Sequence, residues 1–377
     1  MKSESGLRSG LRRSYFIAGG GTGGHIYPGL AIAKALREID PLAEVYFVGT
    51  EEGLEKELVP AAGYKLFLIP GGKLNFAGRW LLKIKTLIRM PLAFVRSAQL
   101  LLQNPPQAVL GVGGYASGPF VMTASLLGFR TALWEPNAFP GLTNRLLARF
   151  VHVCYLVFGE TEKQIKARKI QRLGMPVRAE VEVGHQEIKT NGKKTEIETE
   201  PFRILCFGGS QGARAVNEAL AACLLKLGED QRHLQGRKIE VVHQIGSTDW
   251  AKFQEKYKNM GPWLRPMEFI RDMPERYRWA DLVIARAGAS TVSEIAAFGK
   301  PAILIPLPGA EAHQEFNAES MAAKNAVVLL KQKDLTPDRL WSEIESLKNN
   351  PERRREMSSK VIHFFEPEAA RKIAQSL

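Results

Sequence analysis

Cysteines and metal-ligand motifs are scarce in this chain of 377 residues. Its three cysteines, Cys154, Cys206 and Cys223, form no C-x-x-C pair, which disfavours a disulfide framework or a cysteine-based zinc or redox site and favours a reducing cytosol. No Asp-x-Asp and no His, Asp or Glu cluster with metal-ligand spacing occurs, so we expect an activity without a metal or other cofactor. The absence of G-x-x-x-x-G-K-[ST] excludes a P-loop NTPase.

The sequence also lacks a long apolar helix. The longest charge-free run, between Arg96 and Arg130, is interrupted by PP, GG and GP dipeptides, whereas a membrane-spanning helix needs about 20 continuous apolar residues. The basic first residues are followed only by the short run YFIAGGG, which is no signal-peptide core. We therefore expect neither a membrane span nor a secretion signal.

Acidic residues are absent from Leu58 to Trp134, a segment with eight Lys and Arg residues. Together with residues 1–14, this segment carries +11 of the formal net charge of +13. A charge excess confined to the N-terminal half indicates a local partner, such as an anionic membrane or an anionic substrate. No nucleic-acid recognition fold accompanies the charge, so we expect no nucleic-acid partner.

Short apolar runs alternate with amphipathic helical patterns from Tyr15 onward. This alternation predicts an α/β fold of two Rossmann-like, doubly wound parallel-sheet domains that face a cleft. Polar residues 182–200 interrupt the pattern and predict a linker or surface loop, and residues 351–377 predict a helix. The predicted strands are 15–18, 45–48, 66–69, 108–112, 131–134, 151–157, 203–207, 239–242, 282–285 and 302–305.

The first strand leads into GGGTGGH at residues 19–25. Glycines let the backbone approach a ligand closely, and the helix that follows offers free N–H groups and a positive dipole end. The run satisfies G-x-G-x-x-G, so a dehydrogenase with Asp40 or Glu51 at the ribose remains an alternative. A plain strand–helix turn is the simpler interpretation, but the histidine at its end favours a function.

A second glycine-rich turn, FGGSQGAR at residues 207–214, occupies the same place in the second domain. Its Ser210 would donate to a phosphate or cap the next helix. Because this turn lacks the dinucleotide pattern, two such domains suit a nucleotide donor and a separate acceptor better than one nicotinamide cofactor.

A third segment, RAGASTVSE at residues 286–294, contains Thr291-x-x-Glu294, a capping box that predicts a helix start. The same helix N-terminus would bind a diphosphate near Ser290 and Thr291, with Glu294 accepting hydrogen bonds from ribose hydroxyls. A fourth segment, GAEAHQEFNA, is predicted to be a loop beyond a parallel strand, where such folds bind ligands.

Residues 79–99 have helical spacing, and Pro91 should kink or end the helix. Their apolar side, which includes Phe94 and Val95, would pack on the sheet. The alternative is a membrane surface that lies on anionic lipid headgroups. The residues predicted for that surface are Trp80, Lys85, Arg89 and Arg96.

Taken together, several motifs resemble those of the MurG-type UDP-N-acetylglucosamine transferases of peptidoglycan synthesis. They run in order from about residue 15 to about residue 325: GGGTGGHIYPGLAIA, GVGGYASGP, WEPN, GLTNRLLA, GMPVR, FGGSQGAR, EFI, ASTVSEIAA and HQEFNA. Relatives that glycosylate diacylglycerol, and a UDP-N-acetylglucosamine epimerase, share the fold. GVGGYASGP and GLTNRLLA favour the peptidoglycan enzyme.

The resemblance implies a glycosyltransferase B fold and the transfer of N-acetylglucosamine from UDP-N-acetylglucosamine to the C4 hydroxyl of the muramyl sugar of lipid I. Transfer with inversion would give lipid II. The implied domains are residues 14–178, for acceptor and membrane, and 179–358, for the UDP-sugar. A basic tail at 1–13 precedes them, and a helix at about 360–377 packs back on the first domain.

The resemblance also implies site residues. Ile270 would border the uracil, Glu294 the ribose, and Ser290 with Thr291 the diphosphate. Gly21 and Tyr115 would line the acceptor side. The implied donor contacts are Thr22, Gly23, Gly24, Asn137, Arg178, Ser210, Ile270, Ala289, Ser290, Thr291, Val292, Ser293, Glu294 and Gln314.

For the general base, His25 is the first candidate because an imidazole is largely neutral near pH 7, and Glu135 is the second. Helix N-termini and Arg178 would stabilise the leaving UDP in place of a metal. The sequence has Pro136 where the family usually has Gln, and Met175 where Asn is usual.

The implied partners are UDP-N-acetylglucosamine, lipid I, an anionic membrane surface and proteins of the wall-synthesis machinery. The implied location is peripheral, on the cytoplasmic face of the plasma (inner) membrane. A dehydrogenase and a non-catalytic membrane- or nucleic-acid-binding protein remain the alternative classes.

Overall fold

The computed structural model describes residues 13–51, 53–71, 80–190, 201–209, 211–230, 239–309 and 313–377. Side chains are described for these residues except 80–89 and 227–230. The chain divides into two compact units. The first unit is drawn from Met1–Pro136, Pro140–Val177 and Glu368–Leu377, and the second from Asn137–Phe139 and Arg178–Pro367.

The first unit is built on a seven-stranded parallel sheet with the strand order β3-β2-β1-β4-β5-β6-β7. The chain moves outward from β1 in one direction, then returns to β4 and moves outward in the other. The carboxyl ends of β1 and β4 therefore lie side by side at the switch point of the sheet. The strands are β1 (Ser14–Gly19), β2 (Glu44–Gly49), β3 (Lys65–Leu68), β4 (Ala108–Gly113), β5 (Thr131–Glu135), β6 (Val153–Leu156) and β7 (Ile170–Arg172).

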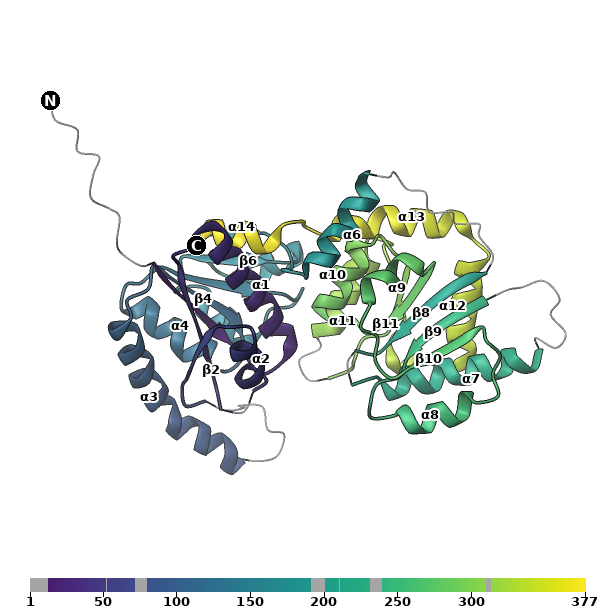
Figure 1. The fold of residues 1–377 in the computed structure, drawn as a ribbon, viewed down its shortest axis with the longest axis horizontal. Coiled ribbons are helices and arrows are strands. Elements are labelled where there is room, and N and C mark those ends of the chain that lie inside the picture. The colour runs from purple at the N-terminus through teal and green to yellow at the C-terminus, as the bar shows by residue number, and fades with distance from the viewer. Residues whose placement is uncertain are drawn as a thin grey trace. The chain divides into compact units, whose positions relative to one another are not determined.

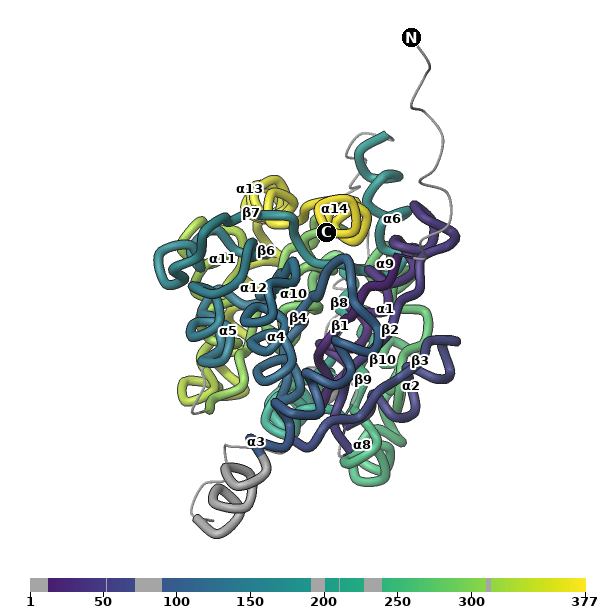
Figure 2. The backbone as a smooth tube through the Cα atoms, turned by 90° about the vertical axis from the view of Figure 1, so that its left-hand side faces the viewer, coloured from purple at the N-terminus to yellow at the C-terminus, as the bar shows by residue number. Residues whose placement is uncertain are grey.

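Helices cover both faces of this sheet, which explains why its central strands β1 and β4 are buried apolar runs without alternation. Phe16 packs in a core with Phe120 of α4, whereas Ile17 on the opposite face lies against Gly29 of α1. Figure 2 shows β4 and β1 between α4 and α1. The helices are α1 (Gly23–Ile39), α2 (Glu55–Ala61), α3 (Trp80–Gln103), α4 (Ser117–Leu126), α5 (Leu142–Leu147) and α14 (Ala369–Ser376), with a 3-10 turn η1 (Gly159–Gln164).

The second unit repeats this architecture with a six-stranded parallel sheet in the order β10-β9-β8-β11-β12-β13. Its switch point lies between β8 and β11, which pair directly. The predicted fold class, two Rossmann-like doubly wound parallel sheets, is confirmed. The strands are β8 (Phe202–Phe207), β9 (Ile239–Gln244), β10 (Leu264–Met267), β11 (Leu282–Ala285), β12 (Ala302–Leu304) and β13 (Val328–Leu329).

Two helical layers enclose the second sheet (Figure 1). Ile204 and Ile284 share a core with Leu220 of α7 and Leu340 of α12, and Phe207 on the other face meets Tyr277 of α9 edge to face. The helices are α6 (Ala179–Thr190), α7 (Arg214–Asp230), α8 (Trp250–Tyr257), α9 (Met273–Trp279), α10 (Ala289–Ala297), α11 (His313–Ala322), α12 (Pro337–Lys348) and α13 (Pro351–Val361), with 3-10 turns η2 (Gln332–Asp334) and η3 (Ile362–Phe364).

Several local predictions are wrong. Of the predicted linker or loop at 182–200, residues 182–190 are part of helix α6, because a narrow face with Gly184 and His185 packs on α10. Residues 191–200 lie outside the described ones. Pro91 lies inside α3, so the helix does not end there, which was one of the two predicted effects. The predicted single C-terminal helix is two, because Pro367 disfavours a helical residue before it and Glu368 adopts φ 58°.

Two predictions about helix starts are also wrong. Helix α10 begins at Ala289 with Gly288 as its N-cap, so Thr291 lies inside the helix and forms no capping box. The HQEFNA motif, predicted as a loop, begins helix α11 at His313. Among the described residues, no helix combines the length and the apolar character needed to cross a bilayer.

Candidate functional site

Two glycine-rich loops meet at the switch point of the first sheet. Gly20 follows β1, and its N–H donates to the carbonyl of Gly113 at the end of β4, 3.2 Å away. Gly113 and Gly114 have φ values of 99° and 85°, and a Cβ at Gly114 would overlap the backbone of Gly20. Glycine is therefore required here both by backbone conformation and by the close approach of the loops.

Thr22 is the N-cap of α1, and Gly23 and Gly24 are the first residues of that helix. Thr22 forms no side-chain capping bond, and its carbonyl accepts from the N–H groups of His25 and Ile26. These predicted donor contacts, together with Gly21, lie at the carboxyl edge of the sheet, where doubly wound folds bind ligands.

His25 is half-buried in the first turn of α1, where its Nδ1 lies 3.2 Å from the carbonyl oxygen of Gly20. Because a carbonyl oxygen only accepts, this contact requires the proton on Nδ1 and leaves Nε2 as the basic nitrogen of the neutral ring. A Cβ at Gly113 would lie 2.9 Å from Nε2, so the second glycine loop borders the same ring.

Tyr115 and Glu135 belong to the same unit but have different surroundings. Tyr115 follows the second glycine loop and is 37% exposed, whereas Glu135 ends β5 and is 2% exposed. The Oε2 of Glu135 accepts from the N–H of Gly141 at 3.0 Å and from Nδ2 of Asn144 at 2.8 Å. These contacts hold the carboxylate at the start of α5.

In the second unit the loop after β8 also makes close backbone contacts. Gly209 and Gly212 have φ values of 92° and 82°, and a Cβ at Gly212 would overlap the carbonyl of Ile245. Ser210 lies outside the described residues. Arg214 opens α7, beyond this loop.

Gln244 connects this loop to the predicted uracil contact. Its side chain is 3% exposed; Nε2 donates to the carbonyl of Gly209 at 2.9 Å, and Oε1 accepts from the N–H of Ile270 at 2.8 Å. One amide therefore holds the Ile270 segment and the glycine loop together.

The N-terminus of α10 lies directly beyond β11. Ala289, Ser290 and Thr291 form its first turn. The N–H groups of a first turn have no acceptor within the helix and lie at the positive end of the helix dipole. Val292 and Ser293, also predicted as donor contacts, have buried side chains. This turn suits an anion such as a diphosphate.

Glu294 projects from α10 and is held on both carboxylate oxygens. Oε2 accepts from the hydroxyl of Tyr277 at 3.1 Å, and Oε1 lies 3.4 Å from Nη2 of Arg178. Burial raises the pKa of Glu294, and the charge of Arg178 opposes that increase. The carboxylate can accept hydrogen bonds from hydroxyl groups of a bound sugar or nucleoside.

Helix α11 brings two amides to the β11–α10 turn. Oε1 of Gln314 accepts from the N–H groups of Ala287 and Leu307. Asn317 is fully buried; its Nδ2 donates to the carbonyl of Ala287 and to Oδ1 of Asn137. Asn137 therefore belongs to the second unit, as part of the short segment Asn137–Phe139.

A cavity of about 500 Å³ opens in the second unit beside these groups. It lies at the switch point between β8 and β11, where a nucleotide is expected in this type of sheet. Residues 208 and 212–215, Glu218, Arg286, Leu307, Gln314 and Gln332 line it. Within the described residues, no group of three or more His, Cys, Asp or Glu side chains could hold a metal ion.

Two family models match the chain: the glycosyltransferase family 28 N-terminal domain over residues 15–156 and the family 28 C-terminal domain over residues 203–375. A Bdellovibrio bacteriovorus protein named UDP-N-acetylglucosamine–N-acetylmuramyl-(pentapeptide) pyrophosphoryl-undecaprenol N-acetylglucosamine transferase is 47% identical over 97% of this chain and 99% of its own length. The chain belongs to glycosyltransferase family 28. A Myxococcus xanthus protein of the same name is 39% identical over 95% of this chain and 90% of its own.

One solved structure agrees with the family 28 assignment, and a second shares the fold. The crystal structure of Acinetobacter baumannii MurG matches with a TM-score of 0.77 and 28% identity, over 97% of this chain and 98% of the other. A UDP-GlcNAc 2-epimerase from Neisseria meningitidis matches with a TM-score of 0.65, 11% identity and coverage of 96% and 99%. At that identity the second match shows a shared fold alone.

The sequence motifs do not mark four residues that contact this candidate site: Glu55, Gln244, Tyr277 and Asn317. Each is buried and hydrogen-bonds a predicted site residue or its loop. Their partners are 34, 26, 17 and 180 residues away along the chain, so no local motif marks them. Among the four, Asn317 alone lies within a motif noted in the sequence, HQEFNA.

Proposed function

We propose that this chain transfers N-acetylglucosamine from UDP-N-acetylglucosamine to the C4 hydroxyl of the muramyl sugar of lipid I, with inversion, and so forms lipid II. The observation that carries the proposal is the 47% identity over 97% of the chain to a relative named for this donor and acceptor. The transfer belongs to peptidoglycan synthesis. A diacylglycerol glycosyltransferase and a UDP-N-acetylglucosamine epimerase remain the alternatives within the fold.

The donor would bind to the second unit. The first turn of α10 offers N–H groups to the diphosphate, and Glu294 offers a carboxylate to the ribose hydroxyls. When the anomeric carbon is attacked, negative charge develops on the leaving UDP. The N–H groups of α10 and the guanidinium of Arg178 would stabilise that charge without a metal ion.

His25 would act as the general base in the first unit. Its neutral ring, with the proton on Nδ1, has a lone pair on Nε2 that can take the proton of the C4 hydroxyl as the oxygen attacks. Tyr115 and the glycine loops at the same edge would border the acceptor sugar.

An assay of the purified full-length chain tests the reaction. With UDP-N-acetylglucosamine and a soluble lipid I analogue, we expect UDP release that depends on both substrates and a disaccharide product with a β-1,4 bond. Diacylglycerol in place of lipid I, and UDP-N-acetylglucosamine alone, provide the comparisons. Transfer to diacylglycerol, or conversion of the donor to its 2-epimer, would contradict the proposal.

The base is tested by His25→Ala. General-base catalysis is typically worth about 10²–10⁴-fold, so we expect kcat to fall within that range with a nearly unchanged KM for the donor. His363→Ala is the matched control, because this exposed histidine lies in the second unit outside the site. A normal kcat for His25→Ala would remove His25 from the role and leave Glu135 as the candidate.

Metal independence is tested with excess chelator. We expect full activity. The positive end of the α10 dipole and the guanidinium of Arg178 would supply the positive charge that a divalent cation would otherwise bring to the diphosphate. Activity that disappears with chelator and returns with Mg²⁺ or Mn²⁺ would contradict this prediction.

We also propose that α3 lies on the anionic surface of the membrane that carries lipid I, at its cytoplasmic face. Leu92, Val95 and Leu102 of this helix are 59%, 57% and 64% exposed, and Arg96 is exposed beside them. Val95 therefore does not pack on the sheet as predicted. The side chains of Trp80, Lys85 and Arg89 lie outside the described ones.

The membrane proposal is tested by replacing Lys85, Arg89 and Arg96 with Gln. At roughly 1 kcal/mol per basic residue, we expect sedimentation with phosphatidylglycerol-containing vesicles to weaken by roughly 100-fold. Replacing Lys256, Arg265 and Lys333, which are exposed in the second unit, makes the same change in net charge. Equal losses in both variants would indicate a response to net charge and contradict a role for α3.

A further inference from the structure

Glu55 is a carboxylate buried beside the first glycine-rich loop. It opens helix α2 and is 1% exposed, although a buried charge is costly unless it is fully hydrogen-bonded. Oε1 accepts from the N–H of Thr50 at 2.9 Å and from its hydroxyl at 3.2 Å, and Oε2 accepts from the N–H of Gly21 at 2.8 Å. All three donors come from the segments that follow β1 and β2.

Three glycines make room for this carboxylate. A Cβ at Gly20, Gly49 or Gly53 would overlap the side chain of Glu55. These glycines belong to the loop after β1, the end of β2 and the turn before α2. The backbone of three segments is thus shaped around one side chain, which is more than the capping of a seven-residue helix requires.

The contact with Gly21 has a consequence for His25. The N–H of Gly21 and the carbonyl of Gly20 belong to one peptide group, and in a planar trans peptide these two groups point in opposite directions. Glu55 binds the N–H on one side, and Nδ1 of His25 lies 3.2 Å from the carbonyl oxygen on the other. The orientation of this single peptide therefore connects the carboxylate to the imidazole.

The conformation of the loop would allow the opposite orientation. Gly21 has φ 89°, and rotation of the Gly20–Gly21 peptide by half a turn would bring this angle to negative values that any residue adopts. The rotated peptide would point its N–H toward Nδ1 and so favour the tautomer with the proton on Nε2. That tautomer has no lone pair on the nitrogen that the proposed mechanism uses.

We propose that Glu55 is a positioning residue, which holds the Gly20–Gly21 peptide with its carbonyl toward His25 and thereby keeps Nε2 of the imidazole unprotonated. The inference deepens the proposed function, because it rests on His25 as the base. Its structural part, from Glu55 to the tautomer, is independent of any activity. Only its effect on kcat depends on the proposed reaction.

The first test is Glu55→Gln, which keeps the size of the side chain but has only one acceptor oxygen. Either Thr50 or Gly21 then faces the amide NH₂, which cannot accept. We expect ¹⁵N spectra of histidine-labelled protein to change from the Nδ1–H tautomer of His25 to a mixture. We expect kcat to fall about three- to tenfold, the range that one hydrogen bond controls, with KM for the donor unchanged. Glu57→Gln, at an exposed position of α2, is the control.

The second test leaves Glu55 in place. Gly21→Ala adds a methyl group with no atom within 4 Å, but it disfavours the positive φ and so favours the rotated peptide. We expect the same mixture of tautomers. Gly63→Ala is the matched control, because Gly63 has φ 77° and equal space in the same unit.

The tautomer of His25 tests the positioning role of Glu55, and kcat tests His25 as the base. An unchanged Nδ1–H tautomer in both folded variants, Glu55→Gln and Gly21→Ala, would overturn the positioning role. If Glu55→Gln does not fold, Gly21→Ala decides the question. A changed tautomer with normal kcat would support the structural link and contradict His25 as the base, which His25→Ala reports independently.

Discussion

The phenol of Tyr277 holds the carboxylate that is predicted to bind the ribose. Tyr277 is fully buried, stacks on Phe298 at 5.1 Å between ring centroids, and donates its hydroxyl to Oε2 of Glu294. Burial raises the pKa of Tyr277 well above its usual value, so the hydroxyl remains a donor. Without it, one oxygen of Glu294 would lose its fixed partner.

We predict that Tyr277→Phe raises KM for UDP-N-acetylglucosamine about three- to tenfold and leaves kcat nearly unchanged, since the role proposed for the Glu294 carboxylate is in binding the donor. Kinetics with a 2′-deoxyuridine donor test whether the ribose contact is the cause. The ratio of KM values for this donor and the normal donor should be smaller in the variant than in the wild type. Tyr257→Phe, a buried tyrosine bonded to His243, is the control. Unchanged discrimination relative to Tyr257→Phe would contradict the role of the phenol.

Lys300 makes the free energy of unfolding of the second unit depend on pH. Its Nζ donates to the carbonyls of Arg278 and Ala280, and burial lowers its pKa from 10.5 to about 8, with Asp281 opposing the decrease. Between these values the unfolded chain binds more protons than the folded chain. The free energy of unfolding must therefore rise with pH across this window.

We predict that Lys300→Met removes this rise. Each pKa unit is worth about 1.4 kcal/mol, so the difference in unfolding free energy between the two proteins should change by about 3 kcal/mol from pH 7 to pH 10.5, in favour of the wild type at high pH. Urea denaturation across this range measures it. Parallel curves for the two proteins would show that Lys300 is not the group responsible.

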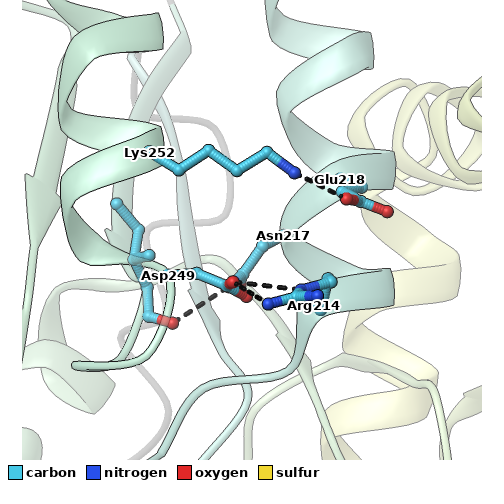
Figure 3. Close-up of polar contacts among 6 residues, drawn as sticks. Arg214, Asn217, Glu218, Asp249 and Lys252 are labelled. Atoms are coloured by element: carbon cyan, nitrogen blue, oxygen red, sulfur yellow. Dashed lines mark hydrogen bonds and ion pairs between the residues drawn. The ribbon is translucent and has the colours of Figure 1, made fainter.

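At the scale of elements, a buried polar network fixes α7 to the loop between β9 and α8. Asn217 is fully buried; its Nδ2 donates to the carbonyl of Ile245 at 2.9 Å, and its Oδ1 lies 3.1 Å from Nε2 of His243. Asp249 binds Arg214 at the start of α7 (Figure 3). This network positions the helix whose N-terminus borders the cavity.

We predict that Asn217→Leu lowers the free energy of unfolding by about 3 kcal/mol, because the carbonyl of Ile245 and the ring of His243 lose their buried partner. Lys252→Gln is the comparison, since its ion pair with Glu218 in the same view is about half exposed on both sides and should cost less than about 1 kcal/mol. Equal losses in urea denaturation would mean that the network contributes no more than a surface pair.

The elements that could be predicted from sequence are those whose signal is local. β1, β8 and β11 are buried on both faces and appear as apolar runs before a glycine-rich turn. β7 (IQR) and β10 (LRPM) contain charged or polar residues, and β13 has only two residues. None of the three is an apolar run, whereas the equally short β11 (LVIA) and β12 (AIL) are. The sequence predicts a wrong start for α10 because the spacing of Thr291 and Glu294 is that of a capping box, although Glu294 is bound by Tyr277 of α9 and by Arg178, the residue before α6.

The residues of the candidate site also differ in whether a local motif predicts them. His25 and the α10 turn lie within recognisable motifs, so their positions at the two switch points followed from the fold class. Glu55 and Gln244 act on loops that only the folded sheet brings beside them, 34 and 35 residues away along the chain. Their roles depend on tertiary contacts that no pattern in the sequence encodes.

At the scale of the whole molecule, the first unit is completed by the last residues of the chain. Ala369 and Ile373 of α14 are fully buried, and α14 packs against α1. Nη2 of Arg130 donates to the carbonyl of Ser376 at 2.9 Å. The C-terminal residues therefore contribute to the core that carries His25, although the rest of the second half of the chain belongs to the other unit.

This arrangement predicts that Ile373→Ala destabilises the first unit, by about 2–5 kcal/mol for a buried aliphatic truncation. Native-state hydrogen exchange should show faster exchange in β1 and β4 and unchanged exchange in β8 and β11. Ile344→Ala, at an equally buried position of α12 in the second unit, should give the reverse pattern. If each variant accelerated exchange in both sheets alike, the chain would unfold as one cooperative body, and the stability of the glycine-rich loops after β1 and β4 would not depend on α14 in particular.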